Sequence, residues 1–240
     1  DVGSIIAATR GITDQNFLAG KLIFDQHSNY NGTVINQGTI IAANHGLVAL
    51  IGANVSNEGI IRANSGSVVL ASGNKVTVDL HGDGLVNFAV EEASSASGVD
   101  QNGNAMRNGV SNSGVVIADG GSILMTAKAA SGVVDNVINM SGVAIARSVS
   151  NENGVIILSG DAEGTVKVSG KIIASGEEIG QTGGTVKILG ANVHLESPAS
   201  VDVSGDAGGG TILIGGNFFG KGIEQNALTT LVDSGVTLNA

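Results

Sequence analysis

The feature of this sequence that most restricts its fold is a passage of about twenty residues that occurs twice within residues 34–80. The string Asn36-Gln37-Gly38-Thr39-Ile40 returns as Asn57-Glu58-Gly59-Ile60-Ile61, 21 positions later. At the same separation, Gly52-Ala53-Asn54-Val55 is followed by Gly73-Asn74-Lys75-Val76. A fixed period of this size in strand-type sequence is typical of a solenoid, in which each copy buries its apolar side against the next.

Three recurring patterns extend the repeat beyond this passage. The first is Val-x-Asn-x-Gly, found at 34–38, 55–59 and 110–114, with looser copies at 137–142 and 149–154. The second is a Gly turn before an alternating strand, at 44–50, 64–70, 119–125, 163–168, 183–188 and 209–214. The third is a Gly or Asn corner before a short strand, at 52–55, 73–78 and 190–195. Each pattern is a strand opened by a corner, so we expect three sides per repeat.

Three short strands in each rung of about 20–22 residues predict an all-β fold, a parallel β-helix. Strand alternation places Val76, Val78 and Leu80 inside the helix, and Thr77 and Asp79 outside. A single rung buries too little apolar surface to offset the entropy of ordering its residues, so rungs must stack. The length of the chain predicts roughly ten rungs.

Repeated Asn and Gly residues are interpreted as structural corners of the rungs. Gly permits backbone conformations with positive φ, and an Asn side chain can bond the nearby backbone. A stacked Asn ladder inside the corner is favoured over a ligand-binding role. The predicted corner residues are Asn36, Gly38, Asn57, Gly59, Asn112 and Gly114.

Composition excludes several classes of function. The net charge of −10 disfavours nucleic acid and anionic membranes as partners, because both attract basic surfaces. There is no Cys, which excludes disulfides and thiolate metal sites. No apolar run approaches the roughly 20 residues of a transmembrane helix. Because 38 of the 240 residues are Gly, long helices are not expected.

The chain is predicted to be a single β-helix domain over residues 1–240. Two stretches depart from the pattern: a polar loop outside the helix at about 91–108, and a divergent rung region at about 215–240. The sequence starts at Asp1 without a signal peptide, so we expect a part of a longer secreted protein. Neither end shows a polar capping helix, which predicts further rungs or end-to-end stacking of chains.

Specificity is expected where the repeat is broken. Glu91, Glu92 and Asp100 in the polar loop are candidate partner-binding residues, as are Phe218 and Phe219. For the Phe pair, burial over the core is favoured, and a carbohydrate-stacking platform is the alternative.

No catalytic, cofactor-binding or metal-binding residue is assigned. The outward acidic residues are scattered instead of paired as general acid/base catalysis requires: Asp79, Asp83, Glu91, Glu92, Asp161, Glu163, Glu177, Glu178, Asp202 and Asp206. The four His residues, at 27, 45, 81 and 194, show no metal-ligand spacing. The stretch 202–210 is only superficially similar to a calcium-binding nonapeptide. Sequons at Asn31, Asn54 and Asn139 are candidate glycosylation sites.

Several strings resemble two-partner-secretion exoproteins, the filamentous-haemagglutinin-type adhesins. They are IIAATRGITDQNFLAG, GTIIAANHGLVALIGANVSNEGII, SGNKVTVDLHGDGLVNFAV, SILMTAKAA and GGTILIGGNFFGKGIEQNALTTLVDSGVTLNA. The resemblance implies a right-handed parallel β-helix, export through a dedicated outer-membrane pore of a Gram-negative bacterium, and a surface role in adhesion. Such proteins carry Asn-Pro motifs, whereas the only Pro here is Pro198, preceded by Ser197.

We therefore predict a non-enzymatic structural and adhesive segment of a large secreted surface protein. Its expected partners are the secretion pore and a host or bacterial glycan or protein on a cell surface, with end-to-end self-association into filaments as a further expectation. A β-helix polysaccharide-active enzyme is the main alternative, and the stalk of a contact-dependent toxin-delivery protein is another.

Overall fold

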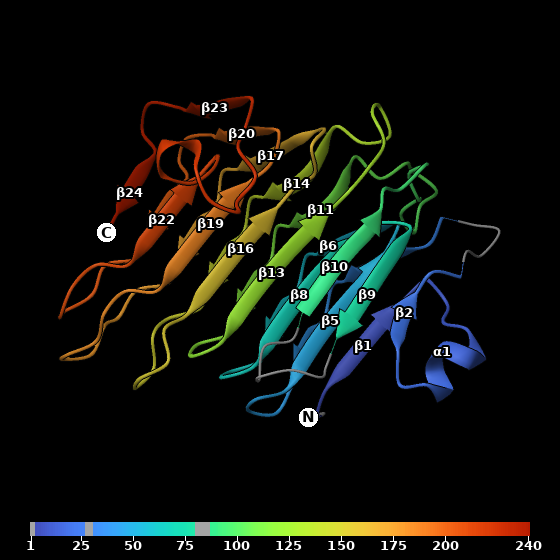
Figure 1. Cartoon of the computed structure of the whole chain (residues 1–240), viewed down its shortest axis with the longest axis horizontal. Helices are drawn as coiled ribbons and strands as arrows, with labels where there is room; N and C mark the ends of the chain where they lie inside the picture. The colour runs from blue at the N-terminus through green and yellow to red at the C-terminus, as the bar shows by residue number, and fades with distance from the viewer. Residues whose placement is uncertain (1–2, 27–30, 80–86) are drawn as a thin grey trace.

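Three parallel β-sheets of seven strands each form the body of the protein, in a computed structural model that describes residues 3–26, 31–79 and 87–240 (Figure 1). We name them sheets A, B and C. Sheet A contains β1 (Ile5–Ala8), β5 (Leu47–Gly52), β8 (Ser67–Ser72), β13 (Ser122–Ala127), β16 (Val155–Ser159), β19 (Thr185–Leu189) and β22 (Thr211–Ile214).

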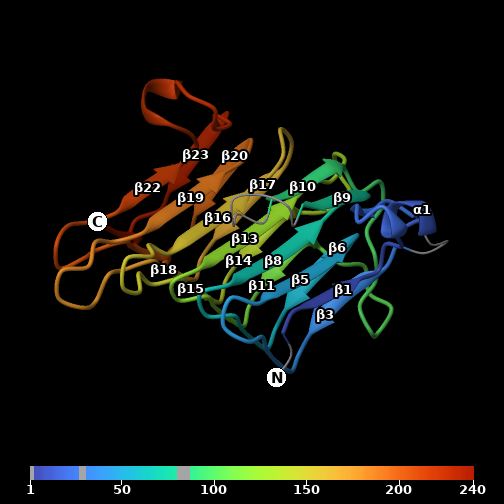
Figure 2. The ribbon, with the colours of Figure 1, turned by 60° about the horizontal axis from the view of Figure 1, so that its bottom comes forward.

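Sheets B and C supply the other two sides of each coil. Sheet B contains β3 (Thr33–Asn36), β6 (Asn54–Asn57), β11 (Asn108–Asn112), β14 (Asn136–Met140), β17 (Thr165–Val168), β20 (Asn192–Leu195) and β23 (Thr229–Val232). Sheet C contains β4 (Thr39–Ile41), β7 (Ile60–Arg62), β12 (Val115–Ile117), β15 (Val143–Ile145), β18 (Lys171–Ile173), β21 (Ser200–Asp202) and β24 (Thr237–Asn239). The chain visits A, B and C in turn, which confirms the predicted parallel β-helix. Figure 2 shows the coils succeeding one another in chain order.

The period is shorter at the N-terminal end than further along. Val34 pairs with Val55 and Asn36 bonds Asn57, at the predicted separation of 21 residues. Asn108 bonds Asn136 at a separation of 28, and Asn192 bonds Thr229 at 37. Asn57 bonds Asn112 at a separation of 55 because β9 and β10 are inserted in that coil, and loops at the corners lengthen the later coils. The described residues therefore form seven coils, and the expected ten was wrong.

Rows of aliphatic side chains fill the interior. One row on sheet B consists of Val55, Val110, Ile138, Val166 and Val193, all at most 1% exposed. Neighbours in this row are paired in register on successive strands. β-Branched residues suit this arrangement because they pack well on a pleated surface.

The Asn ladder lies in the corner between sheets B and C. The Asn36 Nδ2 donates to Asn57 Oδ1 at 2.8 Å, and the Asn57 Nδ2 donates to Asn112 Oδ1 at 2.7 Å. Next along the row, Asn112 Nδ2 lies 3.3 Å from the sulfur of Met140. Met140 takes this place because the looser copy has one extra residue, which moves Asn139 into register with Ser111. The interpretation of the corner Asn residues as a ladder is confirmed.

Corner glycines follow the ladder and allow the coils to approach closely. A Cβ on Gly59 would overlap the carbonyl oxygen of Gly38, and a Cβ on Gly114 would overlap that of Gly59. Any larger residue would push successive coils apart, so Gly is required by the spacing between coils.

A second, smaller sheet lies outside the helix, which the sequence analysis missed. Strands β2 (Leu22–Phe24), β9 (Lys75–Asp79) and β10 (Asn87–Glu92) pair antiparallel in the order β10-β9-β2. They cover the outer face of β5 and β8, and Figure 1 shows β9 and β10 in front of sheet A. Val76 and Val78 are buried in this second core and not inside the helix, so the assignment of 73–78 to a side of the rung was wrong. Leu80 lies outside the described residues.

Other sequence-based assignments also need correction. The pattern at 52–55 and the pattern at 55–59 belong to the same sheet, because Asn54–Asn57 is one strand. The strand at 165–168 belongs to sheet B and not with the sheet A strands, and 149–154 is a turn with a bridge between Val149 and Glu152. Glu91 and Glu92 end β10, and Asn108 begins β11, so the connection outside regular strands is 93–107.

In the described part of the chain no helix is long and apolar enough to cross a membrane.

Candidate functional site

Phe218 and Phe219 are exposed on a loop between β22 and β23. Their side chains are 78% and 80% exposed, and their ring centroids lie 4.3 Å apart with planes tilted by 53°. The favoured burial of this pair was therefore wrong. The pair lies on the short 3-10 turn η1 in the loop between β22 and β23, which holds both rings away from the interior. Ile223 and Leu228 on the same loop are also exposed.

Specific polar contacts hold this loop, residues 215–228, against the outside of sheet A. Asn217 caps a short 3-10 turn, η1 (Phe218–Gly220), by accepting from the backbone N–H of Phe218 at 2.8 Å. Lys187 on β19 forms an ion pair with Glu224 at 2.6 Å. Phe219 has a positive φ of 57°, which is costly for a non-Gly residue. The aromatic pair is thus presented on an anchored support.

Glu91 and Glu92 lie at the end of β10, where both are exposed. Glu91 forms an ion pair with Lys75 at 2.6 Å and also accepts from the Thr77 hydroxyl. The hydrogen bond from Lys75, followed by that from Thr77, lowers the pKa of Glu91 below its ordinary value. The same bond raises the pKa of Lys75. Glu91 is therefore occupied in fastening β10 to β9.

Asp100 organises the connection between β10 and β11. Its Oδ1 accepts from the backbone N–H groups of Asn102 and Asn104 at 2.8 Å, and its Oδ2 accepts from the Asn104 side chain at 3.0 Å. Hydrogen bonds from Asn104 lower the pKa of Asp100. A hollow of about 380 Å³ separates this loop from Thr33, Ile35 and Gln37. Both oxygens of the Asp100 carboxylate accept hydrogen bonds from the loop itself, which leaves little acceptor capacity for a partner.

The structure does not bring the five candidate partner-binding residues together. Glu91 and Glu92 end β10 of the outer sheet, whose Val90 packs with residues of β5 and β8, and the loop of Phe218 and Phe219 is anchored on β19. In sheet A the strands β13 and β16 separate β8 from β19. Asp100 lies beside β3 of sheet B. They are separate surface features and not one site.

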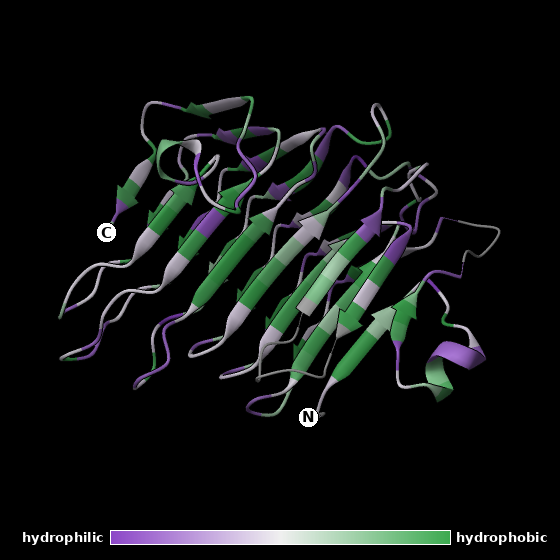
Figure 3. Ribbon diagram, in the orientation of Figure 1, coloured by the Kyte–Doolittle hydropathy of each residue, from purple (hydrophilic) through white to green (hydrophobic). Residues whose placement is uncertain are grey.

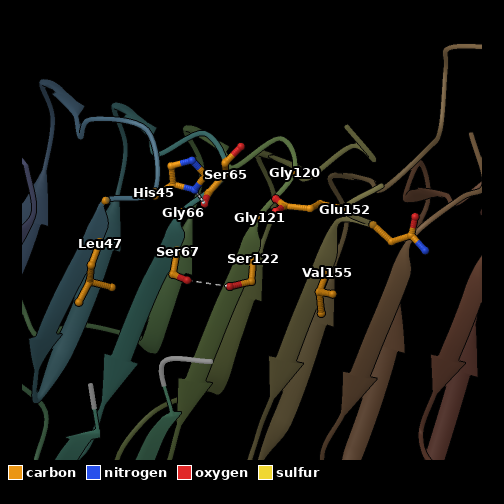
Figure 4. A pocket seen from close by; sticks show the side chains of 12 residues that line it. His45, Leu47, Ser65, Gly66, Ser67, Gly120, Gly121, Ser122, Glu152 and Val155 are labelled. Atoms are coloured by element: carbon orange, nitrogen blue, oxygen red, sulfur yellow. Dashed lines mark hydrogen bonds between the residues drawn. The ribbon is translucent and has the colours of Figure 1, made fainter. Parts of the chain in front are cut away.

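A shallow groove that sequence reasoning missed crosses the N-terminal ends of β5, β8, β13 and β16 (Figure 4). It has a volume of about 520 Å³, and its lining includes His45, Ser65, Ser67, Ser122 and Glu152. The Ser67 and Ser122 hydroxyls are 3.0 Å apart, and the His45 Nδ1 lies 3.1 Å from the carbonyl oxygen of Ser65. The repeated Gly turn before each sheet A strand was the signal available in the sequence.

Several of the remaining polar candidates have structural partners. His194 Nε2 lies 3.1 Å from Asp233, and Asp202 accepts from the backbone and hydroxyl of Ser204. Asn54, in a sequon, is fully buried and donates to the carbonyl of Asn108. Within the described residues, no three His, Asp, Glu or Cys side chains lie close enough to hold a metal ion. His27, His81 and Asp83 lie outside the described residues, as does the side chain of Asp79.

Comparison with known proteins identifies relatives of this fold. Residues 1–174 match the family described as TPS secretion domain. Among solved structures, the chain is similar to the HMW1 secretion domain from Haemophilus influenzae, with a TM-score of 0.78 and 30% sequence identity. The match covers 99% of this chain and 58% of that one, so this chain spans less than two thirds of its relative. No curated protein matches it.

Proposed function

The chain belongs to the TPS secretion domain family, and we propose that it is the exported, shaft-forming segment of an adhesin-type exoprotein. Members of this family are secreted by Gram-negative bacteria, and the family is one of secretion domains and not of enzymes. We propose that the chain directs export and then forms a rigid extension outside the cell.

The order of strand pairing is the observation that carries this proposal. In each of the three sheets, every strand between the two end strands pairs with its equivalent in the coil before it and in the coil after it. A chain that leaves a pore from its N-terminal end can therefore fold coil by coil, because each new coil finds its pairing partner already in place. In such repeat folds each repeat contacts only its neighbours.

The proposed partner during export is an outer-membrane transporter. The matched region, residues 1–174, contains the outer sheet of β2, β9 and β10 and the helix α1 (Asp14–Leu18), which break the regularity of the coils. A transporter that selects this chain needs features that differ from the repeated shaft. The outer sheet and α1, which do not repeat along the chain, offer such features.

We assign the adhesive contact to the loop of Phe218 and Phe219. Exposed aromatic residues on an anchored support are typical of binding hot spots, because little side-chain entropy is lost when a partner covers them. The receptor class proposed is a glycan or protein of a host or bacterial cell surface. Replacing both residues with Ser should reduce attachment of cells that display the full protein, without reducing the amount displayed. Unchanged attachment would contradict this assignment.

The last coil offers a surface for continued growth of the shaft. Val232 and Leu238 are 45% and 46% exposed, whereas Leu195 and Val201, their partners in register one coil earlier, are fully buried. We propose that further coils, from a longer chain or a second copy, cover this end. Light scattering of the purified chain separates the two sources: a monomer at high concentration favours a longer chain.

Export is tested in a Gram-negative host that produces the full exoprotein and its transporter. The full protein should reach the medium only when the transporter is present. Removal of residues 1–174 should retain the protein in the cell, while a Phe218→Ser and Phe219→Ser control should be exported normally. Export without residues 1–174 would refute the proposal.

A further inference from the structure

The outward side chains of sheet C form an apolar surface. At the first and third positions of β7, β12, β15 and β18 they are mostly aliphatic: Ile60, Val115, Ile117, Val143, Ile145 and Ile173. Ile60 is 42% exposed and the others are half-buried, and neither of the two hydrophobic cores includes them. The outer sheet covers part of sheet A, and the Asp100 loop lies beside β3 of sheet B. In the described part of the chain, this face of sheet C therefore remains open to a partner.

The charged residues of this face are placed symmetrically. We number the coils by their sheet C strands, from coil 1 (β4) to coil 7 (β24). The third positions of these strands are paired in register, and from coil 1 to coil 7 they read Ile41, Arg62, Ile117, Ile145, Ile173, Asp202 and Asn239. This row carries one cation in coil 2 and one anion in coil 6, equally far from Ile145 in coil 4. Figure 3 shows β24 with polar residues on both sides of Leu238, so the outward positions of coil 7 are polar.

Both charged residues of the row can reach a partner. Arg62 is exposed and makes no ion pair within the described part of the chain. Asp202 accepts from the backbone and hydroxyl of Ser204 and from the Asn239 side chain, all through its Oδ1. Among the described residues no hydrogen bond reaches the Asp202 Oδ2, so this oxygen can accept from a guanidinium group.

We propose that sheet C binds a second copy of this chain face to face, about a two-fold axis that runs parallel to the strands through coil 4. This rotation reverses the order of the coils and keeps each position along the strand, so coil 2 faces coil 6 of the second copy. Arg62 then faces Asp202 of the second copy, and symmetry forms this pair twice. Between the two ion pairs, Ile145 faces its own equivalent and Ile117 faces Ile173.

Charge selects this arrangement over the other two-fold pairing of facing sheets. An axis along the coils would set each coil against its own equivalent, and the first position of each strand against the third. Arg62 would then face Ile60 and Asp202 would face Ser200, so neither charge would gain a partner. Lys171 on β18 faces an aliphatic residue in both arrangements and favours neither.

The area of this face decides how tightly two copies pair. Six spacings of about 4.8 Å and a strand length of about 10 Å give roughly 300 Å² per copy. A stable interface buries about 800 Å² per partner, so this pair forms only at high protein concentration. A two-fold pair is closed at two copies, which distinguishes it from open-ended stacking at the last coil.

A short bismaleimide reagent tests the pairing with single-Cys variants, because the chain contains no Cys. At millimolar protein, Ile145→Cys should cross-link into dimers, whereas Ile157→Cys, at a half-buried outward position of sheet A, should not. A mixture of Ile117→Cys and Ile173→Cys chains should cross-link more than either variant alone, because coil 3 faces coil 5 of the second copy. Circular dichroism checks that the variants are folded. Equal cross-linking of Ile145→Cys and Ile157→Cys, or no preference for the mixture, would overturn the proposal.

Sedimentation velocity tests the ion pairs. Arg62→Glu should weaken dimerisation at least tenfold, because it sets two carboxylates against each other, and adding Asp202→Arg should restore it. Lys21→Glu makes the same change of net charge outside sheet C and should leave dimerisation unchanged. If the double variant does not fold, the comparison of Arg62→Glu with Lys21→Glu decides. Equal weakening by these two variants, or no dimer of the original chain at millimolar concentration, would refute the assigned interface.

Discussion

The buried Asn ladder shows how single residues hold coils together. Asn57 accepts from Asn36 and donates to Asn112, and it is fully buried. Replacing it with Leu removes both bonds and leaves buried amide groups without partners, at a cost of about 1–3 kcal/mol for each. We expect Asn57→Leu to lower the free energy of unfolding in urea by at least this amount.

The control for this prediction is Gln37→Ala, on the same coils. Gln37 donates to Glu58 at 2.9 Å on the exposed surface. Its loss should change the free energy of unfolding by less than about 0.5 kcal/mol. Similar losses for Asn57→Leu and Gln37→Ala would contradict the role of the buried ladder.

The corner glycines set how closely coils stack. A Cβ on Gly114 would overlap the carbonyl oxygen of Gly59 on the neighbouring coil. We expect Gly114→Ala to lower the free energy of unfolding by about 1–3 kcal/mol through overpacking. Gly38→Ala is the matched control, because a Cβ at this equivalent corner of the first coil meets only Asn36 Oδ1, at 3.9 Å, and Gly38 has no positive φ. Equal destabilisation by the Gly38 and Gly114 variants would show that overlap is not the cause.

The Lys75–Glu91 pair predicts a pH dependence of stability. Hydrogen bonds from Lys75 and Thr77 lower the pKa of Glu91 in the folded chain, so its contribution is present above the unfolded pKa, near 4.5. This contribution is lost as the pH falls through the folded pKa. The melting temperature of Glu91→Gln should therefore be lower than that of the original chain at pH 7, and the difference should disappear in acid. A difference that persists below pH 3 would contradict this account.

At the scale of elements, the outer sheet is the least predictable part of the fold. Val76 and Val78 alternate with polar residues as a rung strand would, and both are buried. Alternation shows that one face of a strand is covered, but not which sheet covers it. The antiparallel partners of β9 are β2 and β10, and β2 lies far away in sequence, so only the folded structure identifies them.

The coils themselves were predictable because their signals are local. Gly38 and Gly59 with Asn36 and Asn57 repeat at the spacing of the coils, and the structure places them at equivalent corners. The candidate binding residues were less predictable. Exposure of Phe218 and Phe219 depends on the length and anchoring of loop 215–228, which no periodic pattern encodes.

The outer sheet of β2, β9 and β10 should unfold without unfolding the coils. Val78 is 3% exposed against the outer face of sheet A and does not enter the interior of the helix. We expect Val78→Asp to release β2, β9 and β10 and increase hydrogen exchange in these strands. Protection in β16 and β19 should be retained. Loss of protection throughout the chain would contradict the separation of the two cores.

At the scale of the whole molecule, stability is expected to accumulate coil by coil. Contacts join each coil to its neighbours, so the parts of such a chain are nearly independent beyond one coil. The last coil, β22–β24, has neighbours on one side only, and every residue of β23 and β24 is exposed. Hydrogen exchange should therefore be fastest there and slower toward the middle coils.

Sequential construction of the β-helix is the central claim of this account, and a chain that ends at Ala174 tests it most directly. This chain contains the region matched by the secretion domain family and stops just after β18, at the end of a coil. The measurement is urea unfolding followed by far-ultraviolet circular dichroism. Sequential pairing predicts that residues 1–174 fold alone into β-structure with a cooperative transition and a lower midpoint than the full chain. An unfolded 1–174 chain would show that the later coils are needed for the earlier ones, and would contradict the claim.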